Sequence, residues 1–315
     1  MIKVAILIPS FRPELFFRKL LPEICNQISV LNSSNHYYFE IIVLIPDEFN
    51  LQALAPINTE PFLRILRTSG SGFSVPRNIL WNTASVFDIN IFVDDDQVPR
   101  AHWLEELLTG IEANPNYSVY FGDIYFEIPE NSPNRAFSKL LPKNRLGKER
   151  ELFEIQCGIA NTAFVRRAIP PLVDPFRIDF NDGGEDVSFF ESLKKDGCKF
   201  YELSGCAVTE EWELNRLQGK ELTSRTRRGI SAYYKLRMER KNNNWCEYVD
   251  SCIVYSRFFV TFLISPALIL FLFLNILNPK EVTKIQIRCY IMKIIYVSLF
   301  PWKFKIERIL GSDTS

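Results

Sequence analysis

Residues 89–96 read INIFVDDD, a largely apolar run that ends in three consecutive aspartates. A short apolar run predicts a strand covered on both faces, as in a parallel sheet. Three like charges at its end raise one another's pKa values unless a cation lies among them. Oxygen ligands of this kind suit Mg²⁺ or Mn²⁺ that also binds phosphate oxygens. A solvated acidic turn ahead of the next helix is the alternative, and the motif alone does not decide between them.

The chain before and just after this run alternates between strand and helix patterns. Strands are predicted where short apolar runs occur, and helices where apolar residues recur at helical spacing. The strand candidates are 4–8, 41–45, 64–66 and 89–93, and the helix candidates are 14–31, 74–87 and 103–113. Ser74 is the expected N-cap of the second helix. The alternation predicts a doubly wound α/β sheet, in which ligands bind beyond the carboxyl ends of the strands.

The following hundred residues continue the domain with shorter elements. Strands are expected where aromatic and β-branched residues gather, and loops where polar residues and proline do. The predicted strands are 117–128, 157–165, 200–203 and 207–209, the loops are 129–148 and 179–184, and the helix is 185–196.

Two further motifs carry charged side chains to strand or helix ends. Gly183 and Gly184 precede Glu185 and Asp186, so Asp186 falls in the first turn of a helix, where a carboxylate can act as a general base. Its alternative role is to complement the helix dipole. Arg77 lies in the first turn of the helix that follows a glycine-containing loop, and could hold a phosphate group. The alternative there is an ordinary surface helix start.

Composition excludes several classes of protein. The 315 residues carry 37 basic and 37 acidic side chains, so no net field favours nucleic acid. Seven cysteines without paired spacing argue against a disulfide framework and indicate a reducing compartment. Two histidines are too few for a histidine-rich metal site.

These motifs, in this order, resemble the family 2 glycosyltransferases of the GT-A fold over residues 1 to about 215. The segments that carry the resemblance are VAILIPS at 4–10, EIIV at 40–43, VPRN at 75–78, FVDDD at 92–96, GIANTAF at 158–164 and Glu185-Asp186. Each motif is weak alone, but the ordered set with its spacing is specific.

The resemblance implies a metal-dependent inverting transfer from a nucleotide sugar, with a UDP-sugar as the expected donor. Asp186 would be the catalytic base, and Asp96 the main metal ligand of a D-x-D motif. Asn161 and Glu185 would lie on the acceptor side. The implied donor-binding residues are Pro9, Ser10, Asp47, Arg77, Asp94, Asp95, Arg227 and Arg228.

The sequence departs from the family pattern at two places. The family usually has an aspartate directly after the second strand to hold the nucleotide base, where this chain has Ile45, with Asp47 just beyond. The family often has a histidine metal ligand after a late strand. Here Glu210 could supply an oxygen instead, or could be a solvated turn residue.

The C-terminal residues 246–315 form a predicted membrane-associated helical region behind a catalytic domain of residues 1–245. Residues 258–277 carry no charge and are long enough to cross a bilayer, although Pro266 interrupts them. A buried core helix is the alternative. Residues 285–302 read as an amphipathic interfacial helix. We expect a shallow membrane anchor without a full crossing, with the catalytic domain facing the cytoplasm, where nucleotide sugars are made.

The basic segment around Arg227 and Arg228 has two open interpretations, a clamp on the donor diphosphate or attraction to anionic lipid. The leading functional hypothesis is transfer to a lipid-linked or saccharide acceptor in surface glycan synthesis. A catalytically inactive, membrane-anchored scaffold that binds sugar nucleotides is the alternative, and a sugar-phosphate nucleotidyltransferase ranks third.

Overall fold

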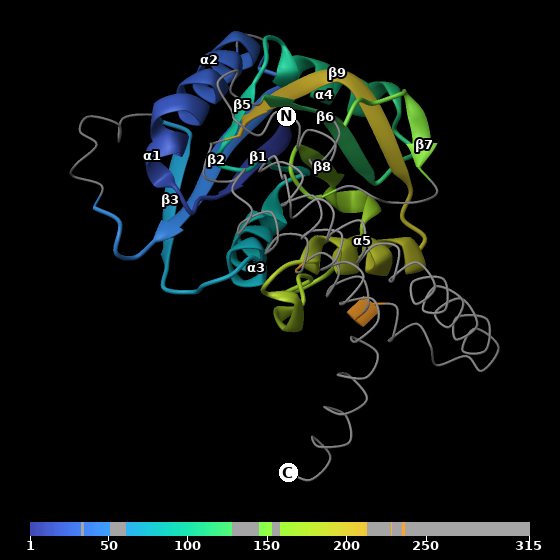
Figure 1. The fold of residues 1–315 in the computed structure, drawn as a ribbon. Coiled ribbons are helices and arrows are strands. Elements are labelled where there is room, and N and C mark those ends of the chain that lie inside the picture. Colours follow the sequence, from blue (N-terminus) through green and yellow to red (C-terminus); the bar gives the residue numbers. More distant parts are fainter. Residues whose placement is uncertain are drawn as a thin grey trace, which may run out of the picture. The chain divides into compact units, whose positions relative to one another are not determined.

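The computed structural model describes residues 1–32, 35–50, 61–127, 145–152 and 158–212, together with 228, 235 and 236. The chain divides into two compact units, Met1–Pro129 with Pro142–Trp212, and Glu130–Leu141 with Glu213–Ser315. All helices and strands labelled in Figure 1 belong to the first unit. The predicted boundary between residues 245 and 246 lies outside the described residues and stays a prediction.

One mixed sheet organises the first unit. Its strands are β1 (Ile2–Pro9), β2 (Tyr37–Pro46), β3 (Leu63–Thr68), β4 (Ile89–Phe92), β5 (Gln97–Pro99), β6 (Val119–Glu127), β7 (Arg150–Leu152), β8 (Thr162–Val165) and β9 (Phe200–Glu211). They lie in the order β3-β2-β1-β4-β8-β6-β9-β5, with β7 paired to β9. The first four are parallel, as predicted, whereas β8 runs antiparallel to β4 and begins the mixed half.

Helices cover both faces of the sheet, as the alternating pattern predicts (Figure 1). The longer helices are α2 (Leu21–Leu31), α3 (Ser74–Thr83), α4 (Trp103–Ala113) and α5 (Glu185–Lys195). The short α1 (Pro13–Leu15) and the π-helical turn Phe16–Leu20 lead directly into α2, so the predicted helix 14–31 is continuous but irregular.

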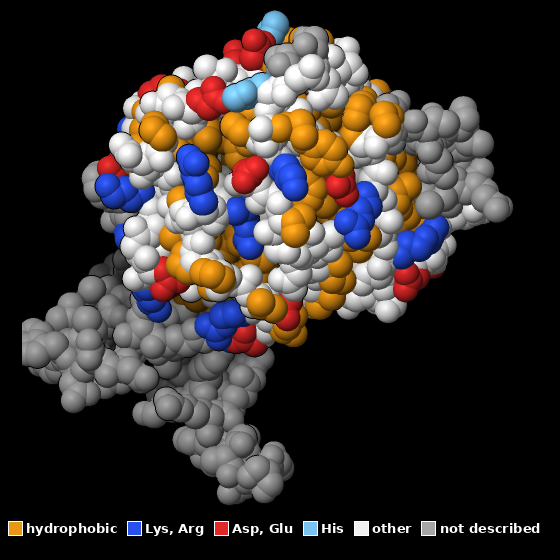
Figure 2. Space-filling view, turned by 180° about the vertical axis from the view of Figure 1, so that it is seen from behind, with side chains coloured by type: hydrophobic (Ala, Val, Ile, Leu, Met, Phe, Trp, Pro, Cys, Tyr) orange, Lys and Arg blue, Asp and Glu red, His pale blue; other side chains and the backbone are white. Residues whose placement is uncertain are grey.

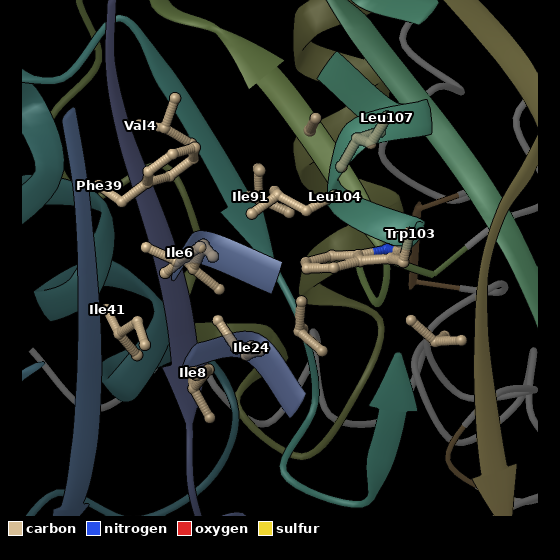
Figure 3. Close-up of a cluster of buried hydrophobic side chains, with 14 of the residues drawn as sticks. Val4, Ile6, Ile8, Ile24, Phe39, Ile41, Ile91, Trp103, Leu104 and Leu107 are labelled. Carbon is tan, nitrogen blue, oxygen red and sulfur yellow. The ribbon is translucent and has the colours of Figure 1, made fainter. Parts of the chain in front are cut away.

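The two faces of β1 supply two separate cores. Val4, Ile6 and Ile8 pack with α2 and α4, and Figure 3 shows Ile6 and Ile8 close to Ile24. Ala5 and Leu7, which point the other way, pack with aromatic side chains of α3 and α5. Because successive strand residues face opposite sides, a continuous apolar run is what a strand between two helical layers requires.

The structure corrects several predictions in detail. Phe73 is the N-cap of α3 and Ser74 is its first residue, and the Ser74 hydroxyl donates to the Arg177 backbone oxygen at 2.8 Å instead of capping the helix. Helix α3 ends at Thr83 and continues only as the 3₁₀ turn Ala84–Val86. The two short strands predicted at 200–203 and 207–209 are one strand, β9. Strands β5 and β7 were not predicted.

Figure 2 shows one face of the molecule, on which acidic and basic side chains are interspersed with apolar ones. Among the described residues drawn there, no continuous basic surface is seen. None of the described helices is long and apolar enough to cross a membrane. The apolar stretches 258–277 and 285–302 lie outside the described residues.

Asn90 is a polar residue in the middle of the core. It belongs to β4 and its side chain is fully buried. Within the part of the chain that the structure describes, neither its amide nitrogen nor its amide oxygen has a hydrogen-bond partner. Strand alternation places it on the same side as Phe92, within the aromatic core. A buried amide without partners costs free energy of folding.

We expect Asn90→Leu to raise the free energy of unfolding by about 1–3 kcal/mol, because an apolar side chain of similar shape removes that cost. Thermal and denaturant unfolding would measure it. The matched control is Asn78→Leu, because the Asn78 amide is bonded to the Phe176 backbone at 2.7 and 2.8 Å and its loss should lower stability. A lower melting temperature for Asn90→Leu would mean that its amide has a partner in solution.

Candidate functional site

The carboxyl ends of β1 and β4 meet because the two strands are parallel neighbours. Ser10 follows β1 and Asp94, Asp95 and Asp96 follow β4, so the predicted donor-binding residues of both strands gather at one edge of the sheet. Pro9, the last residue of β1, is buried beside them. The sheet therefore creates this cluster from residues about 85 positions apart, as the strand pattern predicts.

Asp95 is a structural member of the cluster. Its carboxylate accepts hydrogen bonds from Ser10 Oγ at 3.1 Å and from the Arg12 backbone amide at 2.6 Å. Burial, then the neighbouring Asp96, raises the pKa of Asp95, and the Arg12 and Ser10 bonds oppose that rise. Asp95 thus ties the loop after β1 to the turn after β4, and its buried oxygens face that loop.

Asp96, the predicted metal ligand, is paired with Arg12. The guanidinium Nη2 lies 2.5 Å from Asp96 Oδ2 and 3.8 Å from Asp95 Oδ1. Only 10% of the Asp96 side chain is exposed, against 28% for Arg12. Sequence reasoning did not select Arg12, because its partners lie more than 80 positions further along the chain.

Arg77 links the turn after β4 to the start of α5. It lies in the first turn of α3, and its side chain is buried, which excludes the interpretation as an ordinary surface helix start. Its Nη1 forms an ion pair with Glu185 Oε1, and its Nη2 lies 3.9 Å from Asp94 Oδ1. Three predicted site residues, far apart in sequence, are therefore in one chain of contacts.

Asp186 lies next to this chain of contacts. Its charge contributes to the raised pKa of Asp94, so the two carboxylates lie within electrostatic range. A Cβ atom on Gly158 would be 3.2 Å from Asp186 Oδ2, so the glycine leaves space beside that oxygen. Glu185, by contrast, is buried against Arg77, with Oε2 lacking a partner.

The electrostatics of Asp94 reflect an excess of negative charge. Burial in the cluster raises its pKa to about 6, Arg77 lowers it, and Asp96, Asp95 and Asp186 raise it further. The side chain still has 34% of its surface exposed, so the carboxylate remains reachable from outside. Two guanidinium groups do not balance the carboxylates gathered here.

Four of the remaining predicted residues are Asp47, Glu210, Arg227 and Arg228. Asp47 is exposed just after β2, and its backbone oxygen accepts a hydrogen bond from Arg67 at 2.8 Å. Glu210 lies on β9, in register with Gln97, the residue after Asp96. Arg227 lies outside the described residues, and Arg228 belongs to the second unit, so their roles stay predictions.

Asn161 joins structural elements and presents no surface. It is fully buried at a positive φ, and its Oδ1 accepts a hydrogen bond from Trp103 Nε1 at 2.8 Å. Its Nδ2 donates to the backbone oxygens of Asp123 and Cys206. Since all of these contacts join α4, β6 and β9, we leave Asn161 out of the acceptor side.

Sequence reasoning also missed two aromatic residues near Arg77. Phe11, with 45% of its surface exposed, contacts Phe73 edge to face at 5.7 Å between ring centroids. The Arg77 guanidinium lies 5.7 Å from the centroid of the Phe73 ring. Their positions in the sequence could have indicated them, because Phe11 follows the end of the first strand and Phe73 precedes Arg77 by one helical turn.

Within the described ranges, no group of three or more His, Cys, Asp or Glu side chains is arranged to hold a metal ion. Asp95 faces the loop after β1 and Glu185 faces Arg77, and of the two other aspartates of the turn Asp94 is accessible, whereas Asp96 is paired with Arg12. Two carboxylates fit Mg²⁺ or Mn²⁺, because such ions take the rest of their ligands from water and phosphate. Burial, and then the neighbouring carboxylates, raise the pKa of Asp94 against the effect of Arg77.

No protein-family model matches this chain, and no curated protein matches it. Three crystal structures of residues 1–349 of S. aureus TarS are similar at 14% identity and a TM-score of 0.45. The match to the complex with UDP covers 73% of this chain and 65% of the TarS chain. The match to the complex with UDP-GlcNAc covers 72% of this chain and 65% of the TarS chain. The third structure covers 78% and 76%. The chain thus spans just under two thirds of the first two TarS chains.

The raised pKa of Asp94 gives a pH-dependent prediction. Below the ordinary aspartate pKa of 3.8 the group is protonated in both states, and between 3.8 and about 6 the folded state binds the extra proton. Stability from this group is therefore fully present at low pH and is lost as pH rises through about 6. We expect Asp94→Asn, measured in EDTA, to melt higher than the parent protein at pH 7.

The difference in melting temperature between Asp94→Asn and the parent should shrink as pH falls from about 6 to about 4, because Asp94 becomes neutral in the parent. Asp47→Asn makes the same charge change at another strand end, at an exposed position, and is the control. A constant difference across the pH range would contradict the assignment.

Proposed function

We propose that this chain is an inverting glycosyltransferase that moves a sugar from a UDP-sugar to a saccharide or lipid-linked acceptor in surface glycan synthesis. The observation that carries the proposal is the contact of the buried Arg77 guanidinium with both Asp94 and Glu185, with Asp186 following Glu185 in the first turn of α5. This contact unites a cation for a diphosphate with a carboxylate that can accept a proton, at the edge of the sheet where ligands bind.

The donor diphosphate is the ligand that Arg77 suits. A guanidinium offers a planar set of donors that matches phosphate oxygens, and the Nε of Arg77 is buried without a hydrogen-bond partner. The nucleoside end would extend toward Pro9, Ser10 and Asp47, and the rim formed by Phe11 and Phe73 suits a flat ring. Arg227 and Arg228 are proposed as a further clamp on the diphosphate.

The residues proposed to hold a divalent metal are Asp94 and Asp96, and Glu210 is a proposed additional oxygen ligand. A bound Mg²⁺ or Mn²⁺ would supply positive charge to the departing nucleoside diphosphate. Asp94 has both an exposed surface and an excess of neighbouring negative charge, which supports its place in this set. Asp95 is proposed to hold the turn in the shape that presents the other two.

Asp186 is proposed as the general base. It would accept the proton of the acceptor hydroxyl while the oxygen attacks the sugar carbon that bears the diphosphate. Attack from the side opposite the leaving group inverts the configuration at that carbon. Glu185 positions the first turn of α5 through its ion pair with Arg77, so the base and the diphosphate-binding cation share one support.

We expect Asp186→Asn to lower the rate of transfer by at least 10²-fold while donor affinity stays near that of the parent, because the amide keeps its size but cannot accept the proton. Calorimetry would measure UDP-sugar binding, and UDP release would measure turnover. Asp182→Asn, an exposed aspartate four residues earlier, is the matched control and should behave like the parent. Near-normal turnover in Asp186→Asn would assign the base to another group.

A thermal-shift series of nucleotide sugars with Mn²⁺ separates the transferase from the inactive scaffold. A ligand at 100 times its dissociation constant stabilises the folded state by about 2.7 kcal/mol. A transferase releases some free UDP from the stabilising donor by hydrolysis, whereas a scaffold binds the donor and releases none. The absence of stabilisation by every nucleotide sugar would contradict both.

The proposed location is the cytoplasmic membrane surface, with residues 258–277 and 285–302 as a shallow anchor. We expect the protein to remain with membranes at high salt and to be released by detergent, because apolar burial is insensitive to ionic screening. In sealed cells, an impermeant thiol reagent should not label Lys280→Cys above the background of the parent with its native cysteines. Release by salt alone would contradict insertion, and labelling from outside would establish a full crossing.

A further inference from the structure

Arg12 is held at the aspartate turn by two independent contacts. Its backbone amide donates to Asp95 Oδ2 at 2.6 Å, and Ser10 Oγ donates to the same oxygen. Its guanidinium reaches past Asp95 and donates to Asp96 Oδ2 at 2.5 Å. The hydrogen bonds of the backbone and of the side chain therefore have different carboxylates as partners, although the guanidinium also lies 3.8 Å from Asp95 Oδ1.

The Arg12 backbone amide therefore holds the loop, whereas the Arg12 guanidinium neutralises Asp96. If the guanidinium left Asp96, the bonds from Ser10 and the Arg12 amide would still fasten the loop to Asp95. Arg12 has 28% of its side chain exposed, so solvent-side space is available to it. Asp96, with 10% exposed, is shielded in part by that guanidinium.

Two cations compete for one carboxylate when they approach the same oxygen, because each repels the other and the oxygen has few lone pairs. Asp96 is the carboxylate proposed to bind the metal, and the described structure assigns its Oδ2 to Arg12. Asp94 differs, because its nearest guanidinium atom is 3.9 Å away and its side chain is more exposed. A divalent ion would therefore meet one accessible and one occupied ligand.

We infer that Arg12 is a built-in counter-cation that holds Asp96 in the metal-free protein and is displaced from it by the divalent metal. This inference rests on the metal site of the proposed function. Displacement of Arg12 weakens the affinity of the site for the metal. Arg12 therefore sets the metal concentration at which the site fills.

The test measures Mn²⁺ binding to the full chain without any donor, by calorimetry and by the loss of the free Mn²⁺ paramagnetic resonance signal. Arg12→Gln removes the charge and keeps the backbone amide. We expect it to bind Mn²⁺ about tenfold more tightly than the parent, or about 1.4 kcal/mol. Arg18→Gln makes the same charge change at an exposed position in the next helical turn and should leave the affinity unchanged.

Two further variants separate competition from other effects. Arg12→Gln combined with Asp96→Asn should lose the tight binding, which would tie the gain to Asp96. Arg12→Lys keeps the charge without the planar fork, and should lie between the parent and Arg12→Gln. If Arg12→Gln does not fold, as judged by thermal unfolding, a tighter affinity for Arg12→Lys than for the parent supports the inference and an equal one overturns it.

An unchanged or weaker Mn²⁺ affinity in folded Arg12→Gln would overturn the inference. The same holds if neither the parent nor Arg12→Gln binds Mn²⁺. In either case a separate measurement tests the proposed function, namely UDP-sugar binding to the parent in EDTA and in Mn²⁺. Equal donor binding under both conditions would contradict the metal site and leave the proposed transferase standing.

Discussion

The buried ion pair between Arg77 and Glu185 is the contact on which the arrangement of the site depends. Both side chains are almost inaccessible to solvent, so each needs the other as its counter-charge. Removing one partner of such a pair typically costs about 3–5 kcal/mol, because the remaining charge stays buried. The pair fixes the start of α5 against the start of α3, and Asp94 and Asp186 take their positions from those two helices and the end of β4.

The aromatic core beneath these helices explains why the ion pair can be so well buried. Trp81 on α3 packs edge to face against Phe164 on β8 and Phe189 on α5, with ring centroids 5.4 and 5.1 Å apart. Aromatic edge-to-face packing fixes relative orientation as well as excluding water. Asn78, one turn before Trp81 on α3, adds two hydrogen bonds to the backbone of Phe176. The helix that carries Arg77 is therefore fastened along its length.

Much of this fold follows from patterns within single segments. The strands β1, β2 and β4 are apolar because helices cover both of their faces, and that requirement is visible in the sequence. Helices α4 and α5 were predicted to within a residue, because their apolar spacing is regular. Strands β5 and β7 have three residues each, and they exist because β9 supplies a pairing edge. No local pattern can indicate a strand of that kind.

The same distinction applies to the candidate site. The positions of Asp94 and Asp96 after a strand, and of Asp186 in a first helical turn, can be read from neighbouring residues. The burial of Arg77 against Glu185, the inward position of Asp95 and the pairing of Arg12 with Asp96 depend on partners 83 or more positions away. Asn161 differs, since its motif suggests a ligand-facing residue, whereas its side chain is fully buried and accepts a hydrogen bond from Trp103.

The three consecutive aspartates then have three different environments. Asp95 is held by Ser10 and the Arg12 amide, Asp96 by the Arg12 guanidinium, and Asp94 only weakly by Arg77 at 3.9 Å. A folded protein gains from neutralising buried carboxylates, whereas a cation-binding site needs carboxylates that are not fully neutralised. Asp95 is held within the turn, whereas Asp94 is only weakly paired, as the proposed metal site requires. Burial, and then the neighbouring carboxylates, raise the pKa of Asp94 to about 6.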